Sequence, residues 1–166
     1  EPLRKVGSRM SRTNALPNDA ARLEMAVLRT ARTLRKAYDR RLAGIGLNMT
    51  QASLLLFLQE DGPMTQRELA DRLFIGRAAA SAFIDRLEGR GLVTRNLDTS
   101  DRRVWRIELT EAATSLVVAF KAIDAELHEE VRAGMSHAER RSLAEMLLRL
   151  EANVVKAATA EVQPVA

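Results

Sequence analysis

Cysteine is absent from this 166-residue chain, which excludes a disulfide framework, a zinc–thiolate site and a thiol-based redox sensor. The two histidines are too few for a site built from several histidines, so we expect no bound metal and no other cofactor. Aromatic residues make up only 4% of the chain, although 46% is hydrophobic. The core must therefore come from aliphatic side chains, which favours helices packed on helices. No apolar run reaches the length of about 18 residues that a membrane span needs, so we expect a cytoplasmic protein that does not bind membranes.

The net charge of +4 is unevenly distributed along the chain. Residues 1–48 carry a net charge of +7, residues 49–110 are neutral, and residues 111–166 carry −3. Of the 26 basic residues, 22 are arginines, which can form bidentate contacts with phosphate and guanine. A genome rich in G·C pairs would produce the same bias, so the arginine content alone does not decide the function.

The N-terminal segment, residues 1–18, is polar, and we predict that it is disordered. Its first part, residues 1–9, lacks the apolar stretch of a signal peptide. The pair Gly7-Ser8 just before Met10 indicates that residues 1–9 are an addition to the native chain.

Three long stretches of the chain carry apolar residues at spacings of three or four, which predicts amphipathic helices. One helix occupies most of residues 19–48 and ends near Gly44. Two more fall within residues 111–160, separated at Gly134 and followed by a tail at 161–166. Helices from both chain ends must bury these stripes, so we expect them to form a dimerisation module. Packing against the middle of the same chain is the alternative.

Three shorter helices are predicted at the start of residues 49–110. Their expected ranges are 51–60, 66–74 and 77–89. Thr50 is placed to cap the first, and Thr65 with Glu68 forms the capping-box pattern that begins the second. The very short connection between the second and third helices fits a helix-turn-helix.

The apolar period then changes to two, which predicts a β-hairpin. Its strands are expected at 92–96 and 105–109, with a polar turn at 98–103. Trp105 shares a strand face with Ile107 and is therefore assigned to the core.

The expected fold is mainly α-helical with one small β-hairpin. The expected order along the chain is four helices, then two strands with a wing between them, then two further helices. Thr110 is expected to cap the fifth helix, and Ser136 with Glu139 forms a capping box for the sixth. A winged helix-turn-helix at 49–110 would thus be flanked by a helical dimerisation module.

The helix at 77–89 is the candidate for reading base edges. Opposite its apolar face lie Ala78, Ser81, Ala82 and Asp85, with Arg77 at the N-terminal edge. Small side chains would let the helix sit deep in a major groove, where Arg77 can reach guanine or phosphate. High helix propensity alone would also explain the alanines.

The hairpin turn is the second candidate contact with nucleic acid. Arg102 and Arg103 follow Asp98 and Asp101, so one arginine can be held by a carboxylate while the other enters a minor groove. We favour Arg102 as the residue facing DNA and Arg103 as the structural one. A merely solvated charged turn is the alternative.

Thr65, Gln66 and Arg67 begin a helix whose free N–H groups could bind a phosphate. The capping role alone is sufficient to explain Thr65. No catalytic Ser/His/Asp set, phosphate-binding loop or dinucleotide fingerprint occurs, so we do not expect an enzyme.

These motifs resemble the MarR family of winged-helix transcriptional regulators. The matching pieces lie within residues 50–113. They are Thr65-Gln66-Arg67-Glu68-Leu69-Ala70, Ile84-Asp85-Arg86-Leu87-Glu88, Arg90-Gly91-Leu92-Val93-Thr94-Arg95, Asp98-Thr99-Ser100-Asp101-Arg102-Arg103 and Leu109-Thr110-Glu111.

The resemblance implies a homodimer joined through the first and last two helices, bound to a pseudo-palindromic site in double-stranded DNA. It also implies repression that is relieved when a small, often aromatic, anion binds between the dimer helices and the winged part. Tyr38, Arg41 and Phe57 are candidates for that ligand site. An activating role and a sequence-indifferent architectural DNA-binding protein are the alternative functions.

Overall fold

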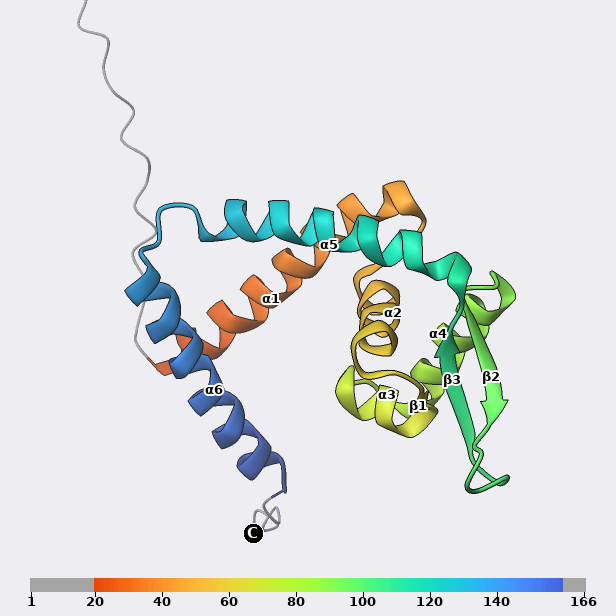
Figure 1. The fold of residues 1–166 in the computed structure, drawn as a ribbon. Coiled ribbons are helices and arrows are strands. Elements are labelled where there is room, and N and C mark those ends of the chain that lie inside the picture. Colours follow the sequence, from red (N-terminus) through yellow and green to blue (C-terminus); the bar gives the residue numbers. More distant parts are fainter. Residues whose placement is uncertain (1–19, 160–166) are drawn as a thin grey trace, which may run out of the picture. The chain divides into compact units, whose positions relative to one another are not determined.

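The structure, a computed structural model, describes residues 20–159. The predicted disordered segment 1–18 and the tail 161–166 lie outside the described residues. The elements are α1 (Ala20–Leu42), the 3₁₀ turn η1 (Ala43–Ile45), α2 (Met49–Asp61), β1 (Met64–Thr65), α3 (Gln66–Arg72), α4 (Arg77–Gly89), β2 (Val93–Leu97), β3 (Trp105–Leu109), α5 (Glu111–Arg132) and α6 (His137–Thr159), as labelled in Figure 1. The predicted fold class is confirmed.

The described part of the chain divides into two compact units, residues 20–49 and 50–159. In the first unit, α1 continues into η1 and the turn ends at Gly46, whose φ of 70° is easily reached by glycine. The N–H of Met49 donates a 2.8 Å hydrogen bond to Oδ1 of Asp39 on α1. The prediction that Thr50 caps α2 is therefore wrong. The helix begins at Met49, two residues before the predicted start, and the carboxylate of Asp39 accepts from its first N–H. Thr50 lies inside the helix and is buried.

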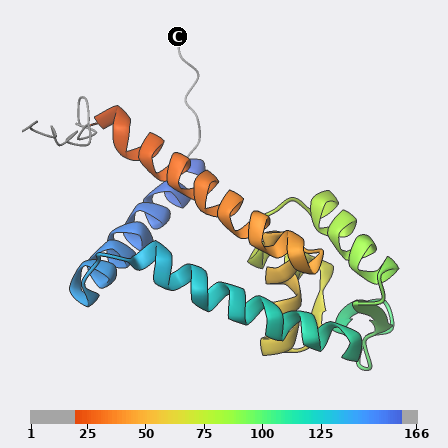
Figure 2. The same ribbon diagram turned by 90° about the horizontal axis from the view of Figure 1, so that it is seen from above.

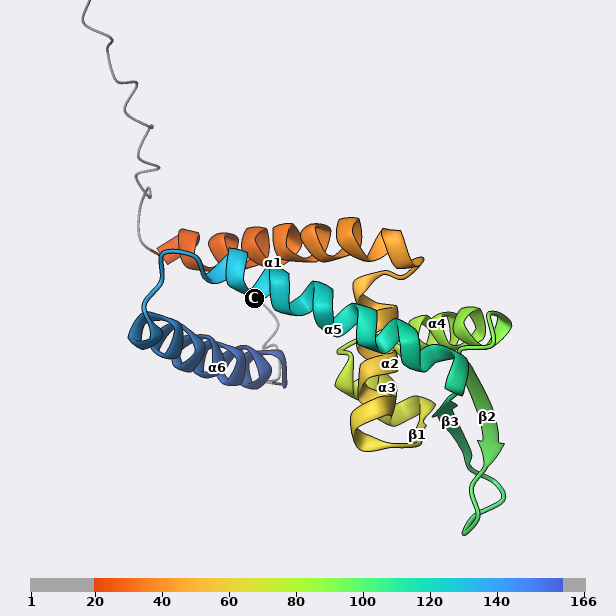
Figure 3. The same ribbon diagram turned by 45° about the horizontal axis from the view of Figure 1, so that its top comes forward.

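The second unit contains a three-stranded antiparallel sheet in the order β1-β3-β2. Its helices α3 and α4 lie beside this sheet, which Figure 3 shows from a second direction. The two-residue strand β1 was not predicted, because it is too short to show an alternating pattern. Large aliphatic side chains with less than 2% exposure form the centre of this unit. They are Leu54, Leu55, Leu69, Ile84, Leu87, Val93 and Ile107.

The turn between α3 and α4 contains Phe74 in the left-handed region, with a φ of 52°. Among the described residues it is the one non-glycine residue with a positive φ. Its side chain is 84% exposed, so the ring contributes little to the core. The short connection predicted for a helix-turn-helix is present, with Gly76 as the N-cap of α4.

The assignment of Trp105 to the core is wrong. Its neighbour on the same strand face, Ile107, is buried, but Trp105 is 55% exposed. Its cross-strand partner Leu97 is 47% exposed. The strands of the hairpin extend past the helices that cover Val93 and Ile107, so the outermost pair on this face is left uncovered.

Two long helices, α5 and α6, complete the second unit. Thr110 stands at the N-cap of α5, but its hydroxyl donates to the carbonyl of Gly91 (2.7 Å) and makes no capping bond, which corrects the predicted role. Ser136 and Glu139 form the predicted capping box of α6, with bonds of 2.8 and 3.3 Å between backbone N–H groups and side chains. Figure 2 shows α6 diverging from α5. Within residues 20–159, no single helix is long and apolar enough to cross a membrane.

Candidate nucleic-acid interface

Helix α4 has one buried face and one small-residue face. Ala80, Ile84 and Leu87 are fully buried against the sheet and the other helices of the unit. Arg77, Ala78 and Ala82 are exposed and Ser81 is half-buried, so all four predicted contact residues lie at the surface of one helix. A face lined by methyl groups allows another molecule to approach the helix backbone closely.

The start of α3 lies beside the start of α4, because Nε2 of Gln66 donates a 3.3 Å hydrogen bond to the carbonyl oxygen of Arg77. Gln66 and Arg77 are thus brought together, as a shared contact surface requires. Arg67 is exposed and lies 3.8 Å from the carboxylate of Asp71 on its own helix. An exposed pair at this distance holds the arginine only weakly.

Thr65 forms a complete capping box with Glu68. The N–H of Thr65 donates to Oε2 of Glu68 at 2.7 Å, and the N–H of Glu68 donates to the Thr65 hydroxyl at 3.2 Å. The hydrogen bonds from the backbone and then the hydroxyl of Thr65 lower the pKa of Glu68. This cap fully occupies Thr65, while the rest of the exposed α3 terminus carries Gln66 and Arg67.

The wing turn is organised by two carboxylates. Asp98 accepts hydrogen bonds from the hydroxyl and N–H of Ser100 and from the N–H of Asp101. Asp101 in turn binds Arg103, whose backbone N–H, Nε and Nη2 donate to it over 3.0–3.2 Å. The side-chain bond from Arg103 is the main reason that the pKa of Asp101 is lowered. Arg102 is exposed and has no ion-pair partner among residues 20–159.

Arg106 is a positioning residue that the sequence reasoning missed. Its Nε donates to Asp98, and its Nη1 donates to the carbonyl oxygen of Pro63 at 3.2 Å and lies 3.9 Å from Glu68. The contact with Asp98 raises the pKa of Arg106. One side chain therefore ties the wing turn to the start of α3.

Arg95 is the second positioning residue that was missed. It projects from β2 and binds both Asp85 and Glu88 of α4. Asp85 had been assigned with the exposed, polar side of α4, but it is held by this arginine. Two signals could have identified the contact. Arg95 follows the buried Val93 by two residues, so both side chains lie on the same strand face. The two acids are three residues apart, so they lie on the same helix face.

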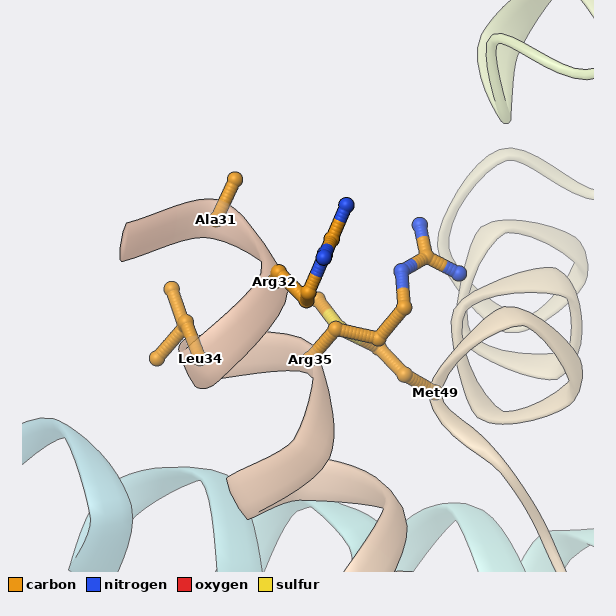
Figure 4. Close-up of a pocket in the computed structure, with 5 residues that line it drawn as sticks. All are labelled: Ala31, Arg32, Leu34, Arg35 and Met49. Atoms are coloured by element: carbon orange, nitrogen blue, oxygen red, sulfur yellow. The ribbon is translucent and has the colours of Figure 1, made fainter. Parts of the chain in front are cut away.

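The three predicted ligand residues do not line an open pocket that lies along α1. Tyr38 is buried, Arg41 is half-buried, and the ring of Phe57 lies 4.5 Å below the guanidinium of Arg72. The pocket has a volume of about 450 Å³. Figure 4 shows Arg32 and Arg35 on one side of this helix with Leu34 pointing away from them; the lining residues are Ala31, Arg32, Leu34, Arg35 and Met49.

Known proteins share this arrangement of helices and strands. The model of the MarR family matches residues 47–105, from just after η1 to the first residue of β3. Transcriptional regulator PA3341 is 32% identical with a TM-score of 0.73, over 80% of this chain and 98% of that chain. The chain belongs to the MarR family.

Two further structures share the fold of this MarR-family protein. The S. aureus MepR–DNA complex is 24% identical with a TM-score of 0.72, over 79% of this chain and 97% of that chain. Bordetella bronchiseptica BpsR, whose DNA binding is regulated by 6-hydroxynicotinic acid, is 19% identical with a TM-score of 0.74, over 81% and 96%. Residues 47–105, which the family model matches, thus contain α3, α4 and β2 of the winged helix of a MarR-family transcriptional regulator. Across residues 20–159, no cluster of three potential metal-binding side chains occurs.

Proposed function

We propose that this MarR-family protein binds double-stranded DNA as a homodimer and acts as a ligand-released repressor. Helix α4 enters a major groove of a pseudo-palindromic site, and the wing enters the adjacent minor groove. One observation carries the DNA-binding proposal. Arg95, Arg103 and Arg106 are each held by a carboxylate, whereas Arg102 at the wing tip has no such partner in the described part of the chain. The ion pairs fix the hairpin in place, and they leave the guanidinium of Arg102 available to bind in a groove of strongly negative potential.

The dimer is supported by the apolar surface of α6. None of its residues is buried, although a folded protein normally covers an extended row of large apolar side chains. The exposed large residues of this helix are Leu143, Met146, Leu147, Leu148, Val154 and Val155. A second copy of the same helix is the simplest cover for such a surface.

The effector we propose is a small aromatic anion. The pocket along α1 supports this class of ligand, because Arg32 and Arg35 line it together with the apolar side chain of Met49. A guanidinium can bind a carboxylate with two parallel hydrogen bonds. The involvement of Tyr38, Arg41 and Phe57 stays a prediction.

Measuring DNA affinity as a function of salt tests the proposed contact. Each cation that neutralises a phosphate contributes about 0.9 to the slope of log K against log salt, so Arg102→Ala should weaken binding and flatten the slope by about that amount. Arg103→Ala is the matched control, because Arg103 is already paired with Asp101, and its loss should be smaller. Arg77→Ala should change the base preference. Wild-type affinity and slope in both Arg102→Ala and Arg77→Ala would contradict the contact assignment.

An architectural, sequence-indifferent DNA-binding protein is the second candidate. The short alanine side chains on the exposed face of α4 favour it, because they can make few hydrogen bonds to bases. Competition between duplexes selected from a random pool and unselected duplexes separates the two functions. We expect the selected duplex to win by about a thousandfold or more, and a ratio near one would support the architectural role.

A further inference from the structure

The wing carries an apolar pair where a solvated hairpin tip would normally be polar. Leu97 and Trp105 are directly opposite each other on β2 and β3, and they are 47% and 55% exposed. Trp105 is the only tryptophan in the chain. About half of each of these large apolar surfaces stays in water and contributes nothing to folding, so the placement of the pair calls for another explanation.

The pair lies on the side of the hairpin that faces α4. Successive residues of a strand point to opposite faces, so Val93, Arg95 and Leu97 share one face of β2. Val93 is buried, and Arg95 reaches Asp85 and Glu88 on α4 from this face. Leu97 and its partner therefore continue the same face outward from the Arg95 contact, in the direction of the wing tip, along the hairpin drawn in Figure 1.

We infer that Leu97 and Trp105 pack against the deoxyribose groups of the one DNA backbone strand that separates the two grooves. This inference rests on the proposed function. If α4 occupies a major groove and Arg102 occupies the adjacent minor groove, the sugar–phosphate strand between these grooves must cross the wing between helix and tip. Leu97 and Trp105 occupy that interval.

The chemistry of the strand fits the pair. Each deoxyribose presents apolar C–H groups between phosphates, and the exposed Arg102 in the wing turn places a positive charge close to the pair. An apolar side chain on deoxyribose neutralises no phosphate and reads no base. The contact therefore adds affinity without changing the salt dependence or the sequence preference.

The experiment uses Trp105 as its own reporter and measures binding to one duplex at several salt concentrations. Adding duplex to the full-length protein should change the emission of Trp105, because the ring passes from water to a contact with sugar. Leu97→Ala and Trp105→Ala should each weaken binding by about tenfold at every salt concentration, with the wild-type slope. Trp105→Phe should retain most of the affinity. Thermal melting of each variant checks that the fold is kept.

Several results would overturn the inference. If Leu97→Ala binds duplex with wild-type affinity while Arg102→Ala binds more weakly, the apolar contact is wrong and the proposed function stands. A changed salt slope in Leu97→Ala would mean that the residue acts by positioning the arginines. Tryptophan emission that duplex leaves unchanged would point to a protein partner at this patch. Absence of any affinity for duplex in the wild-type protein would remove the proposed function and the inference together.

Discussion

Arg95 on β2 binds Asp85 and Glu88 on α4, so the strand that leads into the wing is joined by charge to the candidate recognition helix. The side chain of Arg95 is only 26% exposed, whereas that of Asp85 is 59% exposed. The arginine thus sits in the angle between hairpin and helix with its partners at the surface. Its position fixes the relation between the two parts that are proposed to enter neighbouring grooves.

Replacing Arg95 by methionine should affect DNA binding more than folding. Methionine keeps much of the apolar stem, and an ion pair whose carboxylate lies at the surface contributes about 1 kcal/mol or less to the free energy of unfolding. The wing would lose its fixed angle to α4, so we expect DNA affinity to fall by about tenfold or more. Urea unfolding and duplex titration of Arg95→Met measure the two effects.

A double-mutant cycle between Arg95→Met and Asp85→Asn shows whether the pair acts through this contact. The loss of DNA affinity in the double mutant should be smaller than the sum of the two single losses. Additive losses would show that Asp85 and Arg95 act independently, and that Asp85 influences DNA binding through its own charge.

The wing should keep its order across the neutral range and lose it only in acid. The hydrogen bonds from Ser100 and Arg106 hold the pKa of Asp98 well below its value of about 3.9 in an unfolded chain. Because the folded-state pKa is depressed, this stabilisation is fully present above about pH 4 and is lost as the pH falls further. Trp105 emission should therefore be constant from about pH 8 to pH 5 and change only in more acidic solution.

Asp98→Asn is the control for this titration. The variant lacks the titrating carboxylate, so its free energy of unfolding should lie below that of the wild type at neutral pH. The difference should shrink as the pH falls below about 4, because protonated Asp98 can no longer accept from Arg106 as a charged group. A difference that stays constant down to acidic pH would assign the stabilisation to another group.

The parts of the fold that depend on residues close together in the sequence could be predicted. Both capping boxes, at Thr65 with Glu68 and at Ser136 with Glu139, join residues three positions apart, so the chain itself brings the partners together. Thr50 failed as a cap because the competing acceptor, Asp39, lies on another helix, ten residues before its donor Met49. Local patterns contain no information about such a partner.

The residue types of the candidate site could be predicted from the sequence, but the long-range contacts that hold them in place could not. The arginines of the wing turn are visible in the sequence, but the contact of Arg106 with the carbonyl of Pro63 spans 43 residues. The exposure of Trp105 was missed for a related reason. Alternation assigns a strand face, but it does not say how far the covering helices extend along that face.

Phe74→Gly should leave the stability unchanged or raise it. A left-handed conformation costs a non-glycine residue about 1–2 kcal/mol, and glycine relieves this strain while adding about 0.4–1 kcal/mol of unfolded-state entropy. The ring is 84% exposed, so little burial is lost. We expect a net gain of up to about 1 kcal/mol in urea unfolding. Phe120→Ala is the matched contrast, because that ring is buried and its removal should cost about 3–5 kcal/mol. A clear loss in Phe74→Gly would mean that the ring makes a contact that its exposure conceals.

Leu147→Glu should separate the proposed dimer into monomers. Leu147 lies on the exposed apolar surface of α6, and a second copy of the helix would bury its side chain. An unpaired carboxylate in that contact costs several kcal/mol, so the dissociation constant of the dimer should rise by roughly a hundredfold or more. Sedimentation at several protein concentrations measures this shift. Arg149→Glu, on the opposite face of the same helix, makes a larger change in charge and should leave the dimer intact. If both variants sediment like the wild type, another surface joins the two copies; if the wild type itself is monomeric at every concentration, the proposed dimer is wrong.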